Sequence, residues 1–187
     1  MDKEEIKSID PPIIEINHLL KLLEENRLTQ VLEETSKLLQ HFPKSITLYH
    51  IIGAANNRLG NFDASIKNFE QAISVNPSHA ESYYNLGTVL QAQGKLNQAL
   101  KAYENAINNK RDFAAAYNNT GNLFKEQGNL DKAIASYKKA LAVKRDYPEV
   151  LVNLGNIYKE QGKLEKAVKT YNDALDLKPD YAEPLFN

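Results

Sequence analysis

Asparagine is the residue type in this sequence whose spacing most suggests a specific chemistry. It recurs at a constant step of 34 residues, interrupted at Ile51, and the members of the series are Asn17, Asn85, Asn119, Asn153 and Asn187. A primary amide has one acceptor oxygen and two donor hydrogens, so it can pair with both the C=O and the N–H of an extended peptide. Evenly spaced amides on one surface would hold a strand by its backbone. The alternative is that these amides bridge helices within the fold.

No other combination of side chains predicts catalysis or metal binding. The four histidines are His18, His41, His50 and His79. None of them pairs around a glutamate at the helical spacing that zinc proteases need, and we expect surface histidines. The glycines do not cluster into a phosphate loop, and no serine-centred nucleophile elbow occurs. Tyr103, Tyr137 and Tyr171 recur at the same 34-residue step, as core residues would. We therefore expect no catalytic residue, no cofactor and no metal.

The bulk composition points away from nucleic acids and membranes. The 187 residues carry a formal net charge of −1 and contain no cysteine. Nucleic acids and acidic membrane surfaces select basic proteins, so neither partner is expected. The absence of cysteine excludes disulfides and suits a reducing compartment. Residues 1–10 lack the apolar core of a secretion signal, and no apolar run approaches the ~20 residues of a membrane span. These features predict a cytoplasmic protein.

Two columns of glycines indicate the elements that position these residues. They are Gly53, Gly87, Gly121 and Gly155 in one column, and Gly60, Gly94, Gly128 and Gly162 in the other. Apolar residues around them recur at i, i+3, i+4 and i+7, which predicts two helices per unit with a break at the second glycine. That glycine should take a left-handed conformation. The residues expected to cap the first helices are Ser78, Asp112, Asp146 and Asp180.

Residue size predicts how the two helices of a unit pack. A glycine such as Gly87 opposite the small Ala99 lets the helices approach closely, and Tyr103 should then fill the space against the next unit.

These columns resemble the tetratricopeptide repeat (TPR). One copy reads Tyr83, Leu86, Gly87, Leu90, Ala99, Tyr103 and Ala106. The proline that ends such repeats is present as Pro43, Pro77 and Pro179, whereas Arg111 and Arg145 replace it in two copies. The resemblance implies an all-α fold. It would be a right-handed α-solenoid of antiparallel helix pairs, an α–α superhelix, with the first helix of each pair lining a concave groove.

The repeat pattern divides the chain into seven segments. Four good copies are expected at 46–79, 80–113, 114–147 and 148–181. A degenerate first repeat at 12–45 follows an N-terminal extension at 1–11, and 182–187 is the start of a truncated further repeat. Stacked repeats normally end in a polar capping helix. Its absence predicts that this chain is the front part of a longer protein or was trimmed.

The degenerate first repeat departs from the pattern at its glycine positions. Leu19 stands in place of the first glycine, and Asn26 and Arg27 in place of the second. Its first helix is apolar on two sides. Ile13, Ile16, Leu20 and Leu23 are expected to face the groove, and Ile14, Leu19 and Leu22 the partner helix. Such a helix needs cover on both sides, from residues 1–10, a second chain or an apolar partner segment.

The groove is the expected binding surface. The asparagine series resembles the asparagine ladder in the repeat region of O-linked N-acetylglucosamine transferase, and it implies peptide binding. The residues expected to bind peptide are Tyr84, Asn85, Thr88, Asn118, Asn119, Asn122, Lys125, Asn153, Asn156 and Lys159. Chaperone-binding members of the family grip a C-terminal carboxylate with groove lysines. Those positions here hold Ile16, His50, Tyr84, Asn118 and Val152, so that ligand is not expected.

The sequence thus predicts a non-catalytic scaffold that binds a protein or extended peptide in its groove. A rival interpretation is a targeting or substrate-recruiting arm of a larger enzyme. Similar bacterial proteins carry a glycosyltransferase, sulfotransferase or oxygenase domain after the repeats. A third interpretation is a self-assembling structural repeat, which would associate through the first repeat or the open C-terminal end.

Overall fold

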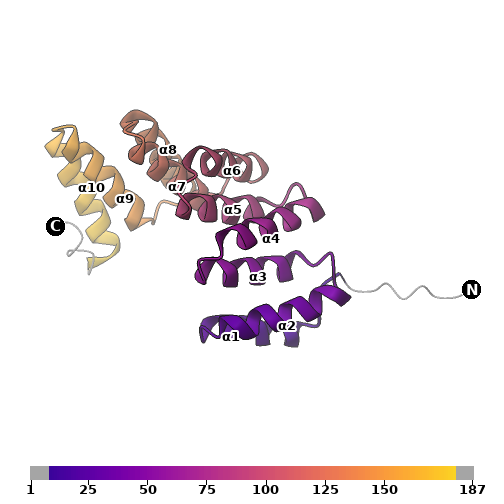
Figure 1. Cartoon of the computed structure of the whole chain (residues 1–187). Helices are drawn as coiled ribbons and strands as arrows, with labels where there is room; N and C mark the ends of the chain where they lie inside the picture. Colours follow the sequence, from indigo (N-terminus) through magenta and orange to yellow (C-terminus); the bar gives the residue numbers. More distant parts are fainter. Residues whose placement is uncertain (1–8, 180–187) are drawn as a thin grey trace, which may run out of the picture. The chain divides into compact units, whose positions relative to one another are not determined.

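The structure is a computed structural model and describes residues 9–179. These residues form ten α-helices and no strand (Figure 1). The helices are α1 (Ile13–Glu24), α2 (Leu28–His41), α3 (Ile46–Arg58), α4 (Phe62–Val75), α5 (Ala80–Ala92), α6 (Leu96–Asn109), α7 (Ala114–Glu126), α8 (Leu130–Val143), α9 (Pro148–Glu160) and α10 (Leu164–Leu177). This is the all-α architecture of paired helices that the periodicity predicts.

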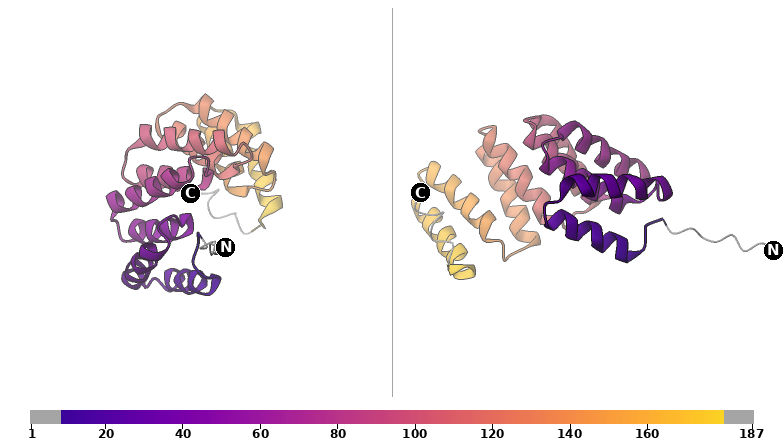
Figure 2. Two further views of the ribbon diagram at one scale, coloured as in Figure 1. Left: turned by 90° about the vertical axis from the view of Figure 1, so that its right-hand side faces the viewer. Right: turned by 60° about the horizontal axis from the view of Figure 1, so that its bottom comes forward.

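The chain divides into two compact units, unit 1 at 1–105 and unit 2 at 106–187, with the boundary near the end of α6. Within unit 1, α1 packs on α2, α2 on α3, α3 on α4 and α4 on α5, while α1 also contacts α3 (Figures 1 and 2). Within unit 2, α7 packs on α8, α8 on α9, and α9 on α10. None of the helices between residues 9 and 179 has the length and apolar character needed to cross a bilayer.

A left-handed residue ends the first helix of every pair. The turn glycines Gly60, Gly94, Gly128 and Gly162 have φ between 70° and 76°. In the first pair Asn26 takes φ 58°, which asparagine tolerates better than most residues. The backbone N–H after each turn residue closes the helix in the same way: Arg27 donates to Leu22, and Lys95 to Leu90, both at 2.9 Å. The first pair therefore keeps the turn although it has lost the glycine.

The first glycine column lies directly beneath the aromatic ring of its own helix pair. A Cβ atom on Gly121 would lie 2.6 Å from Cε1 of Tyr137, which is closer than real carbon atoms approach. The prediction that the aromatic ring packs toward the next pair is also confirmed in unit 2, because Tyr137 shares a buried cluster with Val150 and Leu154 of α9. The small column lies against the glycine as expected, since Ser65 Oγ donates to the Gly53 carbonyl at 2.7 Å.

The first pair reverses the sizes of these two columns. Leu19 occupies the glycine position and Thr35 the aromatic position, and they are 1% and 0% exposed. The large side chain has moved from the second helix to the first, so the space between the helices is still filled. The Thr35 hydroxyl has no hydrogen-bond partner among the described residues.

Two predictions for α1 were wrong. Ile14, expected to face the partner helix, is 78% exposed, and Leu23, expected to face the groove, is 9% exposed. Leu23 joins Leu19 and Leu22 in one core cluster with residues of α2 and α3. The reason is that α1 packs against both α2 and α3 along a single stripe, which excludes Ile14.

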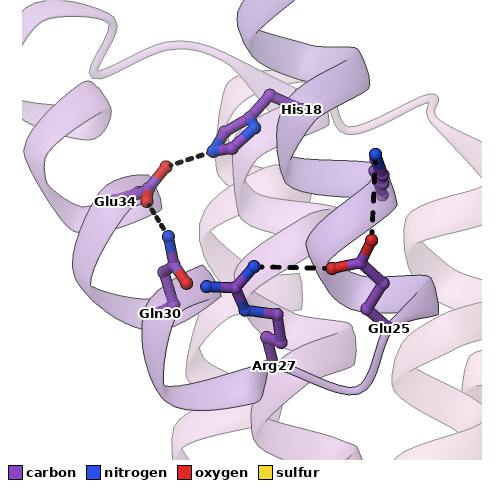
Figure 3. A network of polar contacts seen from close by, with 6 residues as sticks. His18, Glu25, Arg27, Gln30 and Glu34 are labelled. Carbon is purple, nitrogen blue, oxygen red and sulfur yellow. Dashed lines mark hydrogen bonds and ion pairs between the residues drawn. The ribbon is translucent and has the colours of Figure 1, made fainter.

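A surface network also joins α1 to α2 (Figure 3). Glu34 accepts a hydrogen bond from Gln30 at 2.6 Å and lies 2.9 Å from His18 Nε2. The Gln30 hydrogen bond, with a further contribution from His18, lowers the pKa of Glu34. Glu25 pairs with Arg27 at 3.5 Å and with Lys21 at 3.9 Å. Exposed ion pairs of this kind contribute little to stability, so the apolar cluster holds the pair together.

The predicted N-caps were wrong by one residue. The N-cap positions of α5, α7 and α9 are His79, Phe113 and Tyr147, and none makes a side-chain cap bond. Ser45, at the equivalent position before α3, accepts from the Leu48 N–H at 3.1 Å. In the connection before α5, Asn76 Oδ1 accepts from the Ser78 N–H at 3.0 Å, as in an Asx turn. Asp180 lies outside the described residues.

Candidate functional site

In unit 2, α7 and α9 bring three of the predicted asparagines together. Asn118 and Asn122 lie four residues apart on one face of α7, and Asn153 lies on α9. Asn153 Nδ2 donates to Asn118 Oδ1 at 3.4 Å and to Asn122 Oδ1 at 3.3 Å. Asn118 Nδ2 also donates to Asn119 Oδ1 at 3.3 Å. All four side chains are half-buried, so they are ordered and still reach solvent.

Tyrosine hydroxyls donate hydrogen bonds to two of the asparagines that the sequence predicts in the groove. Tyr137 Oη donates to Asn122 Oδ1 at 2.7 Å, and Tyr171 Oη donates to Asn156 Oδ1 at 2.7 Å. Burial raises the pKa of both tyrosines, and the negative charge of Glu160 raises it further. The hydroxyls therefore stay protonated at neutral pH and remain available as donors.

The repeat columns predict these tyrosines in the core but do not predict their hydroxyl contacts. A signal for the contacts does exist in the repeat columns. The residue after the first glycine is Thr88, Asn122 or Asn156 where the ring is tyrosine, and Ala54 where the ring is Phe69. A copy with a tyrosine hydroxyl in the aromatic column thus has a polar side chain after the first glycine. The copy without the hydroxyl has an alanine there.

Unit 1 shows a weaker form of the same arrangement. Tyr103 Oη donates to Gln91 Oε1 at 3.0 Å and lies 3.5 Å from Thr88 Oγ1. Thr88 Oγ1 itself donates to the Tyr84 carbonyl at 3.1 Å, and the Tyr84 ring lies 5.8 Å from that of Tyr103. Asn85 is half-buried, and the structure brings it to no hydrogen-bond partner among the described residues of unit 1. Unit 1 therefore does not repeat the amide cluster of unit 2.

The lysines of the predicted site are partly or fully exposed. Lys125 of α7 and Glu160 of α9 form an ion pair at 3.9 Å, with side chains 34% and 49% exposed. Lys159 is exposed, as is Asn17 at the head of the series, and Asn187 lies outside the described residues. Partly exposed ion pairs of this kind are weak.

Two histidines form a cluster that the sequence analysis did not predict. His50 Nε2 lies 2.7 Å from Ser82 Oγ, and His79 Nδ1 lies 2.9 Å from the same oxygen. The two rings are 5.2 Å apart, and Ser82 is fully buried. The prediction of surface histidines was therefore wrong for His50. Only one copy of the repeat carries this cluster, so periodicity could not reveal it.

The electrostatics of this cluster favour a neutral His50 ring. Burial, with a contribution from His79, lowers the pKa of His50 to about 4, while Glu81 opposes the shift. Within residues 9–179 there is no group of three or more histidine, cysteine or acidic side chains that could hold a metal ion. The buried Ser82 hydroxyl is out of reach of a substrate, so the cluster is a structural contact between α3 and α5.

Comparisons with known proteins place these features in a family. A family model described as a tetratricopeptide repeat matches residues 44–112, and a second, described as a TPR repeat, matches 121–162 and 155–187. Both models describe repeats and not catalytic domains. A search of curated proteins found no significant match.

Several solved structures share the fold. YrrB, described as a TPR protein with an unusual peptide-binding site, has 24% sequence identity and a TM-score of 0.69, covering 97% of this chain and 93% of YrrB. TTC0263 of Thermus thermophilus has 23% identity and a TM-score of 0.71, with coverages of 91% and 93%. MamA of Desulfovibrio magneticus RS-1, from residue 41 onward, has 18% identity and a TM-score of 0.76, with coverages of 90% and 95%.

These identities are low, so the structural likeness concerns the fold alone. The family matches span both units, and they include the glycine and aromatic columns described above. Helical repeats of this kind present surfaces to protein partners and rarely carry chemistry of their own. The chain belongs to the tetratricopeptide repeat family, and it is an all-α helical-repeat solenoid of the protein-interaction scaffold type.

Proposed function

We propose that this chain binds an extended peptide, or an extended segment of a protein, along the first helices of its repeats, and that it does so without catalysis. The amide cluster of Asn118, Asn122 and Asn153 is the observation that carries this proposal. Half-buried amides that already hold each other in place lose little conformational freedom when a ligand arrives. They are therefore better suited to binding than mobile surface asparagines.

The hydrogen bonds between the amides of the cluster are long. The bonds from Asn153 to Asn118 and Asn122 are 3.3–3.4 Å long, whereas protein N–H···O bonds are commonly about 2.9–3.0 Å. These bonds do not use the whole hydrogen-bonding capacity of the amides, so a group of each remains for a peptide backbone. Backbone contacts of this kind supply affinity for any sequence. Lys125 and Lys159, with the neighbouring acidic residues, would select among side chains.

The proposal extends to unit 1 through Tyr84, Asn85 and Thr88. Asn85 is half-buried and belongs to the asparagine series, and it is the amide of unit 1 best placed to pair with a backbone. Each unit thus has its own set of polar side chains on its first helices. Each set can contact an extended segment independently of the other.

A peptide selected by unbiased display on the full chain provides the test. Replacing Asn85, Asn119 and Asn153 together by Ala should weaken that peptide between about tenfold and about a thousandfold. This range follows from one hydrogen bond lost for each of the three asparagines, at about 0.5–1.5 kcal/mol per bond. The matched control is Asn108→Ala combined with Asn172→Ala, two exposed asparagines on second helices, and it should bind the peptide at full strength.

Because Asn153 also bridges α7 and α9, its replacement could lower stability. The double variant Asn85→Ala with Asn119→Ala leaves that bridge intact, and it should still lose affinity. If the triple variant binds the selected peptide as tightly as the original chain, the asparagines serve only the scaffold and the proposal is wrong.

A second candidate function is self-association through the outer face of α10. Leu164 and Val168 are 63% and 58% exposed on that face. Their counterparts in α8, Leu130 and Ile134, instead pack against the buried cluster that includes α9. The α10 face therefore carries side chains of the type that a following first helix covers. We infer that α1 of a second copy, which exposes Ile13 and Ile14, can cover it.

A further inference from the structure

The hydrogen bonds of the unit 2 cluster determine which way each amide points. Asn122 Oδ1 accepts from Tyr137 Oη at 2.7 Å and from Asn153 Nδ2 at 3.3 Å. An amide oxygen has two lone pairs, so both are in use. The part of Asn122 that remains for a ligand is its Nδ2 group, which carries two donor hydrogens.

Asn153, unlike Asn122, makes its hydrogen bonds within the cluster through its Nδ2 group and not through its oxygen. Its Nδ2 donates one hydrogen toward Asn118 Oδ1 and one toward Asn122 Oδ1. Both donors are in use, and the part of Asn153 that remains is its carbonyl oxygen. Asn156 repeats the arrangement of Asn122, because Tyr171 Oη donates to its Oδ1 at 2.7 Å.

The opposite orientation of Asn122 would be unfavourable. It would turn Nδ2 of Asn122 toward Nδ2 of Asn153, leaving two donors facing each other in a half-buried site. Burial, together with Glu126 and Glu160, raises the pKa of Tyr137, so its hydroxyl keeps the hydrogen that it donates to Asn122 Oδ1. The tyrosine ring itself is fixed, since it is fully buried against Gly121.

We propose that Tyr137 and Tyr171 are positioning residues that give the unit 2 surface a defined polarity, in which Asn122 and Asn156 donate hydrogen bonds and Asn153 accepts one. This inference rests on the peptide-binding function proposed above and deepens it. The matching partner is an internal stretch of extended backbone, which offers C=O groups to the donors and an N–H group to the acceptor. A terminal carboxylate lacks the donor that Asn153 requires.

The polarity can be measured first without any ligand. In NMR spectra of the full chain, the side-chain amide hydrogens of Asn153 should exchange with water more slowly than those of Asn122, because within residues 9–179 only the former have hydrogen-bond acceptors. Tyr137→Phe removes one hydroxyl and keeps the ring. Phenylalanine occurs naturally at the equivalent position of another pair, as Phe69. This variant should shift the Asn122 amide signals. Protected hydrogens on Asn122 and unprotected ones on Asn153 would overturn the assignment.

Two isosteric substitutions then make opposite predictions. Asn122→Asp keeps both acceptor contacts, to Tyr137 Oη and Asn153 Nδ2, but removes the outward donors. It should fold normally and bind the display-selected peptide at least about tenfold more weakly. Asn153→Asp keeps the outward acceptor but sets its oxygens against those of Asn118 and Asn122. It should lower the urea midpoint and, under conditions where it is folded, retain most of the affinity.

The added negative charge needs its own control. Asn108→Asp places the same charge on an exposed position of unit 2 and should leave both stability and affinity unchanged. Repeating the comparison in about 0.5 M salt, where charges more than a few ångströms apart are screened, separates repulsion from lost donors. Loss of affinity that disappears in salt for Asn122→Asp would overturn the inference.

The outcomes distinguish this inference from the proposed function. If Asn122→Ala weakens the selected peptide while Asn122→Asp does not, the surface binds peptide but its polarity is not the one inferred. If Asn122→Ala, Asn153→Ala and Asn156→Ala all bind the peptide at full strength, the proposed function itself fails. Equal loss from Asn122→Ala and Asn122→Asp, together with the predicted exchange rates, supports both.

Discussion

Gly121 and Tyr137 are in direct contact across one helix pair, so that a methyl group on Gly121 would lie 2.6 Å from the tyrosine ring. The ring is wholly buried and also packs in the cluster shared with α9, so it has no space into which it could withdraw. The glycine at this position is therefore required by the neighbouring ring and not by its own backbone conformation. The first pair solves the same packing problem in reverse, with Leu19 and Thr35.

The first prediction concerns this contact. Gly121→Leu should destabilise the chain by about 3 kcal/mol, the upper part of the usual range for overpacking a core. In a repeat protein the damage should be largest in the adjacent helices, because each pair contacts only its neighbours. Urea unfolding measures the loss, and hydrogen exchange locates it.

A compensating variant makes this prediction sharper. Combining Gly121→Leu with Tyr137→Thr recreates the size pattern of Leu19 and Thr35. The double variant should be more stable than the sum of the two single changes predicts, as contacting residues in a double-mutant cycle are. Strict additivity would mean that the two positions do not share one space.

The second prediction concerns pH. His50 has a pKa of about 4 in the folded chain, below its ordinary value of 6.5, because it is buried beside His79. Between these two values the unfolded chain binds more protons than the folded one, so stability falls as the pH falls through this window. The stability that depends on a neutral His50 is fully present above pH 6.5. The total loss is at most about 3 kcal/mol.

Urea unfolding between about pH 7.5 and about pH 4.5 measures this dependence. His50→Gln should flatten it, whereas His41→Gln, which changes an exposed histidine, should not. Carboxylates titrate at the lower end of the range in all three proteins, so the difference between variants isolates His50. A His50→Gln protein with the same pH dependence as the original would contradict the assignment.

The third prediction concerns peptide preference. Lys125 pairs with Glu160 at 3.9 Å, and both are partly exposed. Lys125→Glu combined with Lys159→Glu should change stability by no more than about 0.5 kcal/mol, because surface charges contribute little. The same change should shift the peptides recovered by display toward basic residues.

Lys138→Glu is the matched control for this experiment, since Lys138 is exposed on the second helix α8. It should leave the selected sequences unchanged. If the double variant and the original chain select identical peptide sequences, Lys125 and Lys159 take no part in selection.

The fourth prediction concerns self-association. Leu164→Glu with Val168→Glu should abolish any increase in mass with concentration that light scattering detects for the original chain. Leu177→Glu changes another exposed apolar residue of α10, outside this face, and should preserve the increase. A mass for the original chain that stays monomeric across the concentration series would exclude the α10 contact.

The features that the four good copies repeat could be predicted from the sequence, because each of these copies supplies independent evidence for the same local geometry. The left-handed turn glycines and the paired helices are of this kind. The N-caps were missed by one residue because a cap depends on the local path of the turn, and α5, α7 and α9 all begin one residue later than the polar residues predict. In α1, only packing on two neighbouring helices reveals that Leu23 is buried and Ile14 exposed.

The sequence by itself determined the helical repeat, its period and the residues that recur on the first helices. Only the tertiary structure decided which of those residues meet. Asn153 bonds Asn118 and Asn122, and His50 meets His79, because helices of neighbouring pairs bring them within hydrogen-bond distance or ring contact. The physical reason is that periodicity encodes the backbone, which is the same in each copy. A hydrogen bond depends on the particular pair of side chains that two neighbouring copies bring together.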